Sequence, residues 1–337
     1  MNIPSNLMLE NRDEYLRQLS APLKSVPAFT ETGFDLVAAA RCRRHALAYI
    51  CNYGSDYVSV LDVNEARELA AIPVGAGPLD IAIHRIRLIA YVTNFIGNTL
   101  SVLDLRTNRT VRTVTMGKGP AGVRLSRDGR FLYVVHYEEP SVYLLDAITL
   151  EKLLEISLPS TGFDIDITAD GSLAFVTLRS AAQLAVIDLS VNLVVKVIAA
   201  GAGAECVRIS PTDRLAFVSN EDGNSLTAVN VRLAESAVPN IPAAAGPVGL
   251  AYTQGGSRLY CANRQDASVS LFDVFTHSEI ASIPAGNGPY GAETVPGERL
   301  LVVTNTYEDT VSIIDTRENE VTSTAKVGFA PAFLSII

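Results

Sequence analysis

One pattern returns seven times, about every 42 residues, along this chain of 337 residues. An aromatic or apolar residue marks equivalent positions, spaced by 42 except for one step of 43, at Tyr49, Tyr91, Tyr133, Phe175, Phe217, Tyr260 and Val302. An acid or amide follows with the same spacings, at Asp62, Asp104, Asp146, Asp188, Asn230, Asp273 and Asp315. Short apolar runs separated by turn residues at such a period are typical of the blades of a β-propeller.

Each repeat contains four β-rich runs of strand length, separated by turn signals. The first run follows a Gly-Pro turn, as at Gly77-Pro78 and Gly119-Pro120. The segment Ser126–Gly129 predicts a tight turn between the first two strands, and the acid that ends the third strand can accept backbone N–H groups of the next turn. We therefore predict an all-β fold, a seven-bladed propeller of four-stranded antiparallel blades.

The runs YICN, YVTN, YVVH, FVTL, FVSN, YCAN and VVTN, each followed by a run similar to VSVLD, resemble the YVTN-repeat family of seven-bladed propellers. The resemblance covers residues 47–337. That family and its relatives include surface-layer proteins, lactonases, lyases and redox-cofactor enzymes. The resemblance therefore implies the fold and leaves the activity open.

The two ends of the chain set the domain organisation and the ring closure. We expect an N-terminal arm over residues 1–30, with a short amphipathic helix over residues 5–19, and one propeller domain over residues 31–337. The C-terminal segment aligns with the first strand of other repeats, so Ala332–Ile337 is a candidate for the innermost strand of the first blade. Thr32–Ala40 competes for that place, and we favour the C-terminal strand.

The composition limits the kinds of partner that the protein can bind and indicates its cellular compartment. The net charge of −9 leaves no basic surplus for nucleic acid, and no basic run suits a membrane surface. No apolar run reaches the ~18 residues of a membrane span, and the N-terminus has no signal-peptide pattern, so a cytoplasmic protein is expected. The four cysteines lack the spacing of a disulfide framework or zinc site, which predicts reduced thiols.

The sequence offers few ligands for a redox centre. It has four histidines, and His45, His84 and His277 fall in turn or edge positions. A haem or bimetallic site built from several histidines is therefore not expected. We predict no cofactor, and the alternative is a divalent metal held by Asp80, Asp164, Glu205 and His136.

Positions where the repeat is broken are candidates for function, because the consensus residues maintain the scaffold. The second strand usually ends in Asn, but His136 and Leu178 replace it in two repeats, and Arg179 follows Leu178. Two residues after the Gly-Pro proline, several repeats have Gly where others have Asp80 and Asp164, and Glu205-Cys206 lies at the corresponding turn.

These residues belong to loops that share one face of a propeller, around the mouth of the central channel. We predict a funnel there with five catalytic candidates, His136, Asp164, Glu205, Asp80 and Arg179. We expect His136 to lie beside Asp164, whose negative charge would favour the protonated form of His136. His136 would then act as a general acid or base. Substrate-binding walls are predicted from Tyr53, Phe95, Tyr137, Arg264, Tyr290, Tyr307 and Phe333.

The alternative is that these charges form salt bridges that tie neighbouring blades together. A second charged row, Arg124, Asp166, Arg208 and Glu293, alternates in sign and is predicted to be a belt of ion pairs.

Two functional hypotheses follow. In the first, the funnel binds a small organic molecule and catalyses acid–base chemistry of the lyase, cyclase, isomerase or lactonase type without a redox cofactor. In the second, the propeller is a non-catalytic scaffold that grips a protein partner through this face or through the N-terminal helix. The short, uniform loops favour the first hypothesis.

Overall fold

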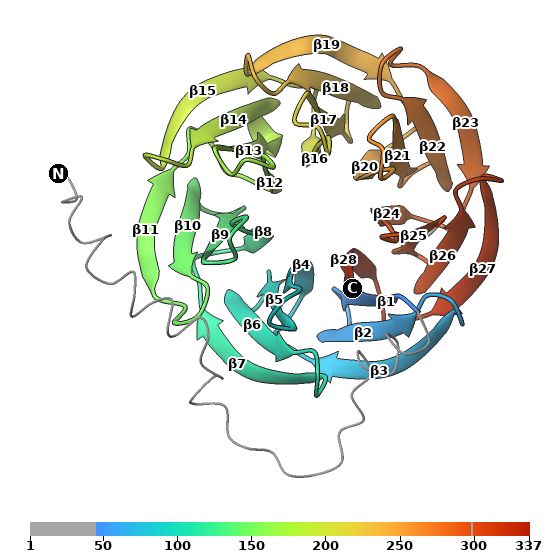
Figure 1. Cartoon of the computed structure of the whole chain (residues 1–337), viewed down its shortest axis with the longest axis horizontal. Coiled ribbons are helices and arrows are strands. Elements are labelled where there is room, and N and C mark those ends of the chain that lie inside the picture. Colours follow the sequence, from blue (N-terminus) through green and yellow to red (C-terminus); the bar gives the residue numbers. More distant parts are fainter. Residues whose placement is uncertain (1–44, 298) are drawn as a thin grey trace. The chain divides into compact units, whose positions relative to one another are not determined.

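The structure is a computed structural model that describes residues 45–297 and 299–337. Figure 1 shows seven four-stranded sheets arranged radially around a central axis, and every neighbouring strand pair within a sheet is antiparallel. In the described ranges, the one helical element is a single turn, η1 (Arg179–Ala181). The predicted seven-bladed propeller is thus confirmed, whereas the predicted arm (1–30), its helix (5–19) and Thr32–Ala40 lie outside the described residues.

The innermost strand of each blade, here called strand A, lines the central axis. In order from blade 1 to blade 7, these strands are β28 (Pro331–Ile336), β4 (Pro78–His84), β8 (Pro120–Leu125), β12 (Ile165–Ile167), β16 (Ala204–Ile209), β20 (Pro247–Tyr252) and β24 (Pro289–Thr294).

Strands B and C follow and are buried almost throughout. Strands B are β1 (Leu47–Asn52), β5 (Ile89–Asn94), β9 (Phe131–His136), β13 (Leu173–Leu178), β17 (Leu215–Asn220), β21 (Arg258–Asn263) and β25 (Leu300–Asn305). Strands C are β2 (Tyr57–Asp62), β6 (Thr99–Asp104), β10 (Ser141–Asp146), β14 (Gln183–Asp188), β18 (Ser225–Asn230), β22 (Ser268–Asp273) and β26 (Thr310–Asp315).

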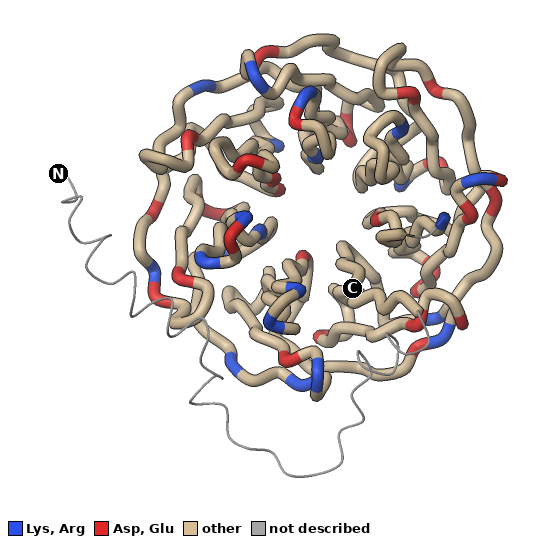
Figure 2. The backbone as a smooth tube through the Cα atoms, viewed as in Figure 1, with Lys and Arg blue, Asp and Glu red and all other residues tan. Residues whose placement is uncertain are grey.

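Strands D form the outer rim and are mostly exposed. They are β3 (Arg67–Pro73), β7 (Arg109–Thr115), β11 (Lys152–Ser157), β15 (Leu193–Ala199), β19 (Glu235–Pro242), β23 (Glu279–Pro284) and β27 (Glu320–Lys326). Acidic and basic residues are interspersed around the ring (Figure 2).

Both repeat ladders have structural roles. Tyr49, Phe175 and Tyr260 are fully buried in strands B, where their rings fill the space between blades. The acid that ends strand C caps the next turn, since Asp273 Oδ1 accepts the N–H groups of Phe275 at 2.9 Å and Thr276 at 2.8 Å. These bonds lower the pKa of Asp273, as expected for a carboxylate that accepts backbone N–H groups. The predicted turn role of this acid is confirmed.

The C-terminal strand closes the ring. β28 pairs antiparallel with β1 and becomes the innermost strand of blade 1, as favoured from the sequence. The N–H of Leu47 donates to the carbonyl of Ile337 at 3.1 Å, and the N–H of Ile337 donates to the carbonyl of Leu47 at 2.9 Å. Both ends of the described propeller are thereby joined in one sheet, which leaves no unpaired inner edge.

Three of the four cysteines lie in the described residues. Cys51, Cys206 and Cys261 are buried free thiols. Across residues 45–297 and 299–337, no helix has the length and apolar character needed to cross a membrane.

Removing residues 331–337 is expected to unfold or aggregate the protein. The deletion exposes the edge of β1 and removes the buried side chains of Phe333, Leu334 and Ile336, which contribute roughly 5 kcal/mol or more together. Size-exclusion chromatography and thermal melting measure the effect. A synthetic peptide of residues 327–337 should restore the melting temperature in part. A truncated chain that stays monomeric with unchanged melting would contradict this closure.

Candidate functional site

A cavity of about 280 Å³ opens at the face that carries the D–A and B–C loops. We call it the funnel, and its lining includes Tyr53, Phe95, Phe163, Tyr290, Glu205 and Arg264. Three of the four rings and both charged residues were predicted from the broken repeats. Phe163 was missed, although it stands at the same repeat position as Tyr290, one residue before the Asp or Gly site.

Aromatic rings follow one another around the funnel. The ring centroids are 6.3 Å apart for Tyr53 and Phe95, 6.0 Å for Phe95 and Tyr137, and 5.7 Å for Tyr137 and Phe163. The series continues inward to Phe333, whose ring lies 6.5 Å from Phe163. Tyr53, Phe95 and Phe163 line the funnel, whereas Tyr137 and Phe333 contact this series of rings but are not part of the funnel lining. Such apolar walls suit a flat, largely apolar ligand.

Glu205 is the buried acid of the funnel. Its Oε2 pairs with Nε of Arg179 at 2.5 Å, and its Oε1 accepts the hydroxyl of Tyr290 at 3.1 Å. Burial raises the pKa of Glu205 to about 7, Arg179 acts in the opposite direction, and Glu221 adds to the rise. A carboxyl group that titrates near neutral pH can give or take a proton, so Glu205 is the strongest acid–base candidate of the predicted set.

Arg264 is the cation of the funnel wall. Its guanidinium lies 5.3 Å from the ring centroid of Tyr290 and 5.2 Å from that of Tyr307. Nη1 contacts Oε1 of Glu221 at 3.3 Å, whereas Nε is buried without a hydrogen-bond partner. Arg264 can therefore offer a donor to an anionic group of a ligand.

Arg179 is held away from the cavity lining by acids. Besides Glu205, its Nη2 contacts Glu221 at 2.7 Å and Asp222 at 3.2 Å. Glu221 thus bridges Arg179 and Arg264, and joins the two cations of this face into one network.

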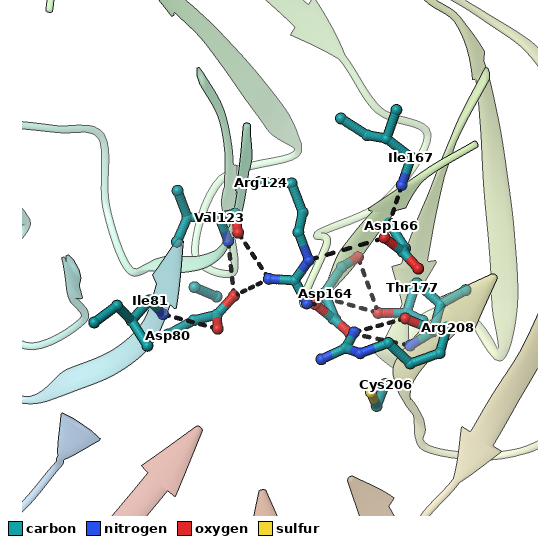
Figure 3. Close-up of polar contacts among 12 residues, drawn as sticks. Asp80, Ile81, Val123, Arg124, Asp164, Asp166, Ile167, Thr177, Cys206 and Arg208 are labelled. Carbon is teal, nitrogen blue, oxygen red and sulfur yellow. Dashed lines mark hydrogen bonds and ion pairs between the residues drawn. The ribbon is translucent and has the colours of Figure 1, made fainter. Parts of the chain in front are cut away.

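Asp80 and Asp164 do not line the funnel; they tie blades together (Figure 3). Asp80 Oδ2 accepts the N–H of Val123 at 2.9 Å and Nη1 of Arg124 at 2.8 Å. Asp164 Oδ2 accepts the N–H of Val207 at 3.1 Å and Nη1 of Arg208 at 2.6 Å. Each acid sits on one blade and its partners on the next, so the structure favours the salt-bridge alternative for this pair.

The second charged row forms a belt with these two acids. Arg124 also lies 3.4 Å from Asp164 and 4.0 Å from Asp166, and connects the acids of blades 2 and 4. Burial raises the pKa of Asp164, but the charges of Arg208 and Arg124 lower it more, so that it lies below its usual range. The predicted ion-pair belt is confirmed for Arg124, Asp166 and Arg208. No ion pair forms to Glu293 within the described residues, and burial raises its pKa to about 7.

Three blades have a glycine two residues after the proline that begins strand A, and this preference has a steric cause. A Cβ at Gly122 would lie 2.8 Å from the carbonyl oxygen of Phe163, one at Gly249 2.1 Å from that of Tyr290, and one at Gly291 2.6 Å from that of Ala332. Adjacent strands A therefore approach too closely for a side chain. Where Asp80 and Asp164 stand, a carboxylate bridges the two strands instead.

His136 lies inside its blade, not in the funnel. It is fully buried at the end of β9, its ring centroid is 4.2 Å from that of Tyr143, and Nδ1 is 3.4 Å from the hydroxyl of Ser141. Burial lowers the pKa of His136 to about 4, and the nearby acids Glu139 and Glu155 offset this only in part. The prediction that it faces Asp164 with its protonated form favoured is wrong.

The break in the repeat at His136 is a compensated pair. In the other blades the Asn at this position donates to a hydroxyl seven residues later, as from Asn94 Nδ2 to Ser101 Oγ at 2.9 Å. In blade 3, Tyr143 replaces that serine and packs on His136. In blade 4, Leu178 and Ala185 occupy the two places as an apolar pair.

All four histidines lie in the described part of the chain, and none lines the funnel. His45 pairs with Asp62 at 2.9 Å near Glu65, and His84 is the last residue of β4, next to the A–B turn of blade 2. The funnel therefore offers aromatic walls, one carboxyl group and one arginine, and its lining carries no imidazole that could hold a haem iron.

Comparison with known proteins finds one family that matches part of the chain and several solved structures of similar fold. The family described as "Cytochrome D1 heme domain" matches residues 45–166. Hydrazine synthase of Kuenenia stuttgartiensis aligns with a TM-score of 0.73 and 19% identity, covering 80% of this chain and 92% of that one. Dihydro-heme d1 dehydrogenase NirN in complex with DHE aligns with a TM-score of 0.65 and 16% identity, covering 91% and 66%.

A protein of unknown function from Desulfotomaculum acetoxidans aligns with a TM-score of 0.75 and 15% identity, covering 86% of this chain and 98% of that one. No curated protein matches the sequence. At these identities the solved structures establish the seven-bladed fold alone. The match to the haem-domain family contradicts the prediction of no cofactor, which had rested on the scarcity of histidines.

The compensated pair generates a prediction. His136→Asn and Tyr143→Ser should each destabilise the protein, because each leaves the other partner without its packing or hydrogen bond. The double variant rebuilds the Asn–Ser pair of blade 2 and should recover most of the loss, with a coupling energy of about 1 kcal/mol or more. Urea unfolding of the four proteins measures this cycle. Strictly additive effects would contradict a structural pair.

Proposed function

We propose that the funnel binds a flat, carboxylate-bearing ring of the tetrapyrrole class, and that Glu205 exchanges protons with the bound molecule. The observation that carries this proposal is the combination of an aromatic cavity with Arg264, whose Nε is buried and has no partner. The partial match to the haem-domain family and the heme d1 ligand class named for NirN support the choice of tetrapyrrole.

Different residues would bind different parts of the ligand. Tyr53, Phe95 and Phe163 would stack on the ring, since aromatic side chains bind flat π-systems with little loss of conformational freedom. Arg264 would pair with a carboxylate arm. The cavity volume of about 280 Å³ is at the lower end for small-molecule sites, so it would receive an edge of a large ring and leave the rest outside.

Glu205 gives the funnel a proton carrier. Below pH 7 it is mainly a carboxylic acid and above pH 7 mainly a carboxylate, because burial raises its pKa to about 7. Arg179 and Tyr290 hold both oxygens in place. A haem-class group, when bound, would bring electron-transfer chemistry or would itself be the substrate. An acid–base reaction on such a ring, of the lyase, cyclase or isomerase type, is the finer part of this proposal, with Glu205 in the role first assigned to His136.

Titration with haemin and with metal-free protoporphyrin tests the proposal. Both should bind, with comparable affinity, because the funnel supplies no imidazole to the iron. Binding should shift the porphyrin absorbance band and quench tyrosine fluorescence, which is free of tryptophan background in this chain. Arg264→Gln should weaken binding roughly 10-fold or more, the cost of losing a charged hydrogen bond.

Arg317→Gln is the matched control, since Arg317 is an exposed arginine in a C–D turn outside the funnel. Its affinity should equal that of the wild type. Absence of binding by both porphyrins, or equal affinity in the Arg264 and Arg317 variants, would overturn the proposal. Binding of haemin without protoporphyrin would show iron ligation by a residue outside the funnel walls and would also contradict it.

A further inference from the structure

A second cavity, of about 430 Å³, lies in the central channel beside the polar belt. Its lining comes from strands A of all seven blades and reaches the A–B turns, at the end of the channel opposite the D–A loops. We call it the lower chamber. Adjacent residues of β28 line the two cavities, Ala332 the funnel and Phe333 the lower chamber. The linings of the two cavities have no residue in common, so the lower chamber is a separate site.

The lower chamber is lined by both arginines and acids, and two of the arginines have no paired acid among the described residues. Its walls carry Arg85, Arg124, Arg127 and Arg208 together with Asp80, Asp166 and Glu293. Arg124 and Arg208 are neutralised by the belt. Arg127 donates only to the backbone carbonyls of Thr168 at 3.0 Å and Ile167 at 2.9 Å, and Arg85 makes no hydrogen bond or ion pair with a described residue.

Two further polar groups belong to residues that line the chamber. The hydroxyl of Tyr252 is buried without a partner, and a phenol can donate to an anion. Glu293 accepts only a long bond, 3.4 Å, from the N–H of Ile336. Burial raises the pKa of Glu293 to about 7, while Arg85, Arg208 and Arg124 act in the opposite direction. Below pH 7 it is therefore also a donor.

We propose that the lower chamber binds a small organic anion with two or more carboxylate or phosphate groups, held by Arg85 and Arg127 and by the hydroxyl of Tyr252. Two guanidinium groups without an acid partner suit two oxyanions better than one. Apolar side chains such as Leu250 and Ala251 line the space between the charged groups and suit a short carbon skeleton. This inference is independent of the ligand proposed for the funnel.

Calorimetric titration at low ionic strength tests the lower chamber, with citrate, succinate and inorganic phosphate as probes and acetate as the singly charged comparison. The net charge of −9 disfavours unspecific anion binding, so a measured heat reports a local site. A polycarboxylate or phosphate should bind at least about 10-fold more tightly than acetate. The ranking of citrate and succinate against phosphate identifies which oxyanion the site takes.

Variants locate the site. Arg85→Gln/Arg127→Gln should weaken binding by roughly 10-fold or more, whereas Arg232→Gln, an exposed arginine in a C–D turn, and Arg264→Gln in the funnel should leave it unchanged. Wild-type affinity for succinate, which is mostly the dianion over this range, should fall as the pH rises from 6 to 8, because Glu293 becomes an anion. Glu293→Gln should remove most of that dependence.

Three outcomes would overturn the inference. They are no binding by any multiply charged probe, unchanged affinity in the Arg85/Arg127 variant, and a pH dependence that persists in Glu293→Gln. Both arginines are exposed, so circular dichroism and melting should confirm that their double variant folds as the wild type. Loss of anion binding in Arg264→Gln would place the probe in the funnel and would equally contradict the inference.

Discussion

The ion pairs of Asp80 and Asp164 with arginines of the following blades are the interaction on which the inner ring depends. Strands A must meet around a narrow axis, and three contacts bring their backbones so close that only glycine fits. At Asp80 and Asp164 the strands are joined by a carboxylate that takes both a backbone N–H and a guanidinium. Burying these charges is tolerable only because each is paired and hydrogen-bonded.

The belt separates two ends of the central channel that differ in the side chains lining them. On one side of the belt the residues before the Asp or Gly position form the aromatic funnel with Glu205 and Arg264. On the other side the residues after it form the lower chamber with its arginines. Side chains alternate along a strand. A shift of one residue along strand A therefore separates a side chain that bridges two blades from one that lines a cavity.

That alternation explains what could be predicted from the sequence. The 42-residue ladders predicted seven blades, and the C-terminal alignment predicted the closing strand. The broken repeats pointed to Glu205, and the loops around the same opening pointed to Tyr53, Phe95, Tyr290 and Arg264; all five line the funnel. Asp80 and Asp164 broke the repeat for a structural reason, because the distance between neighbouring strands A cannot be read from one sequence.

His136 was misassigned because positions were compared one at a time. Its compensating partner Tyr143 stands seven residues later, at the spacing of Asn94 and Ser101, so a comparison of pairs would have found it. The prediction of no cofactor was wrong for a different reason, because it rested on the histidines alone. The funnel holds aromatic rings and an arginine, and such groups can bind a ring and its carboxylates without histidine ligands.

The central claim is that the arginines of the belt are structural and the arginine of the funnel is available for a ligand. Guanidinium unfolding of Arg124→Gln and Arg264→Gln measures this division most directly. Arg124→Gln should lower the free energy of unfolding by about 3–5 kcal/mol, since it leaves a buried aspartate without its cation. Arg264→Gln should cost less than about 2 kcal/mol, because it removes partly exposed contacts to aromatic rings and Glu221. Equal losses in the two variants, or a stable Arg124→Gln protein, would contradict the account.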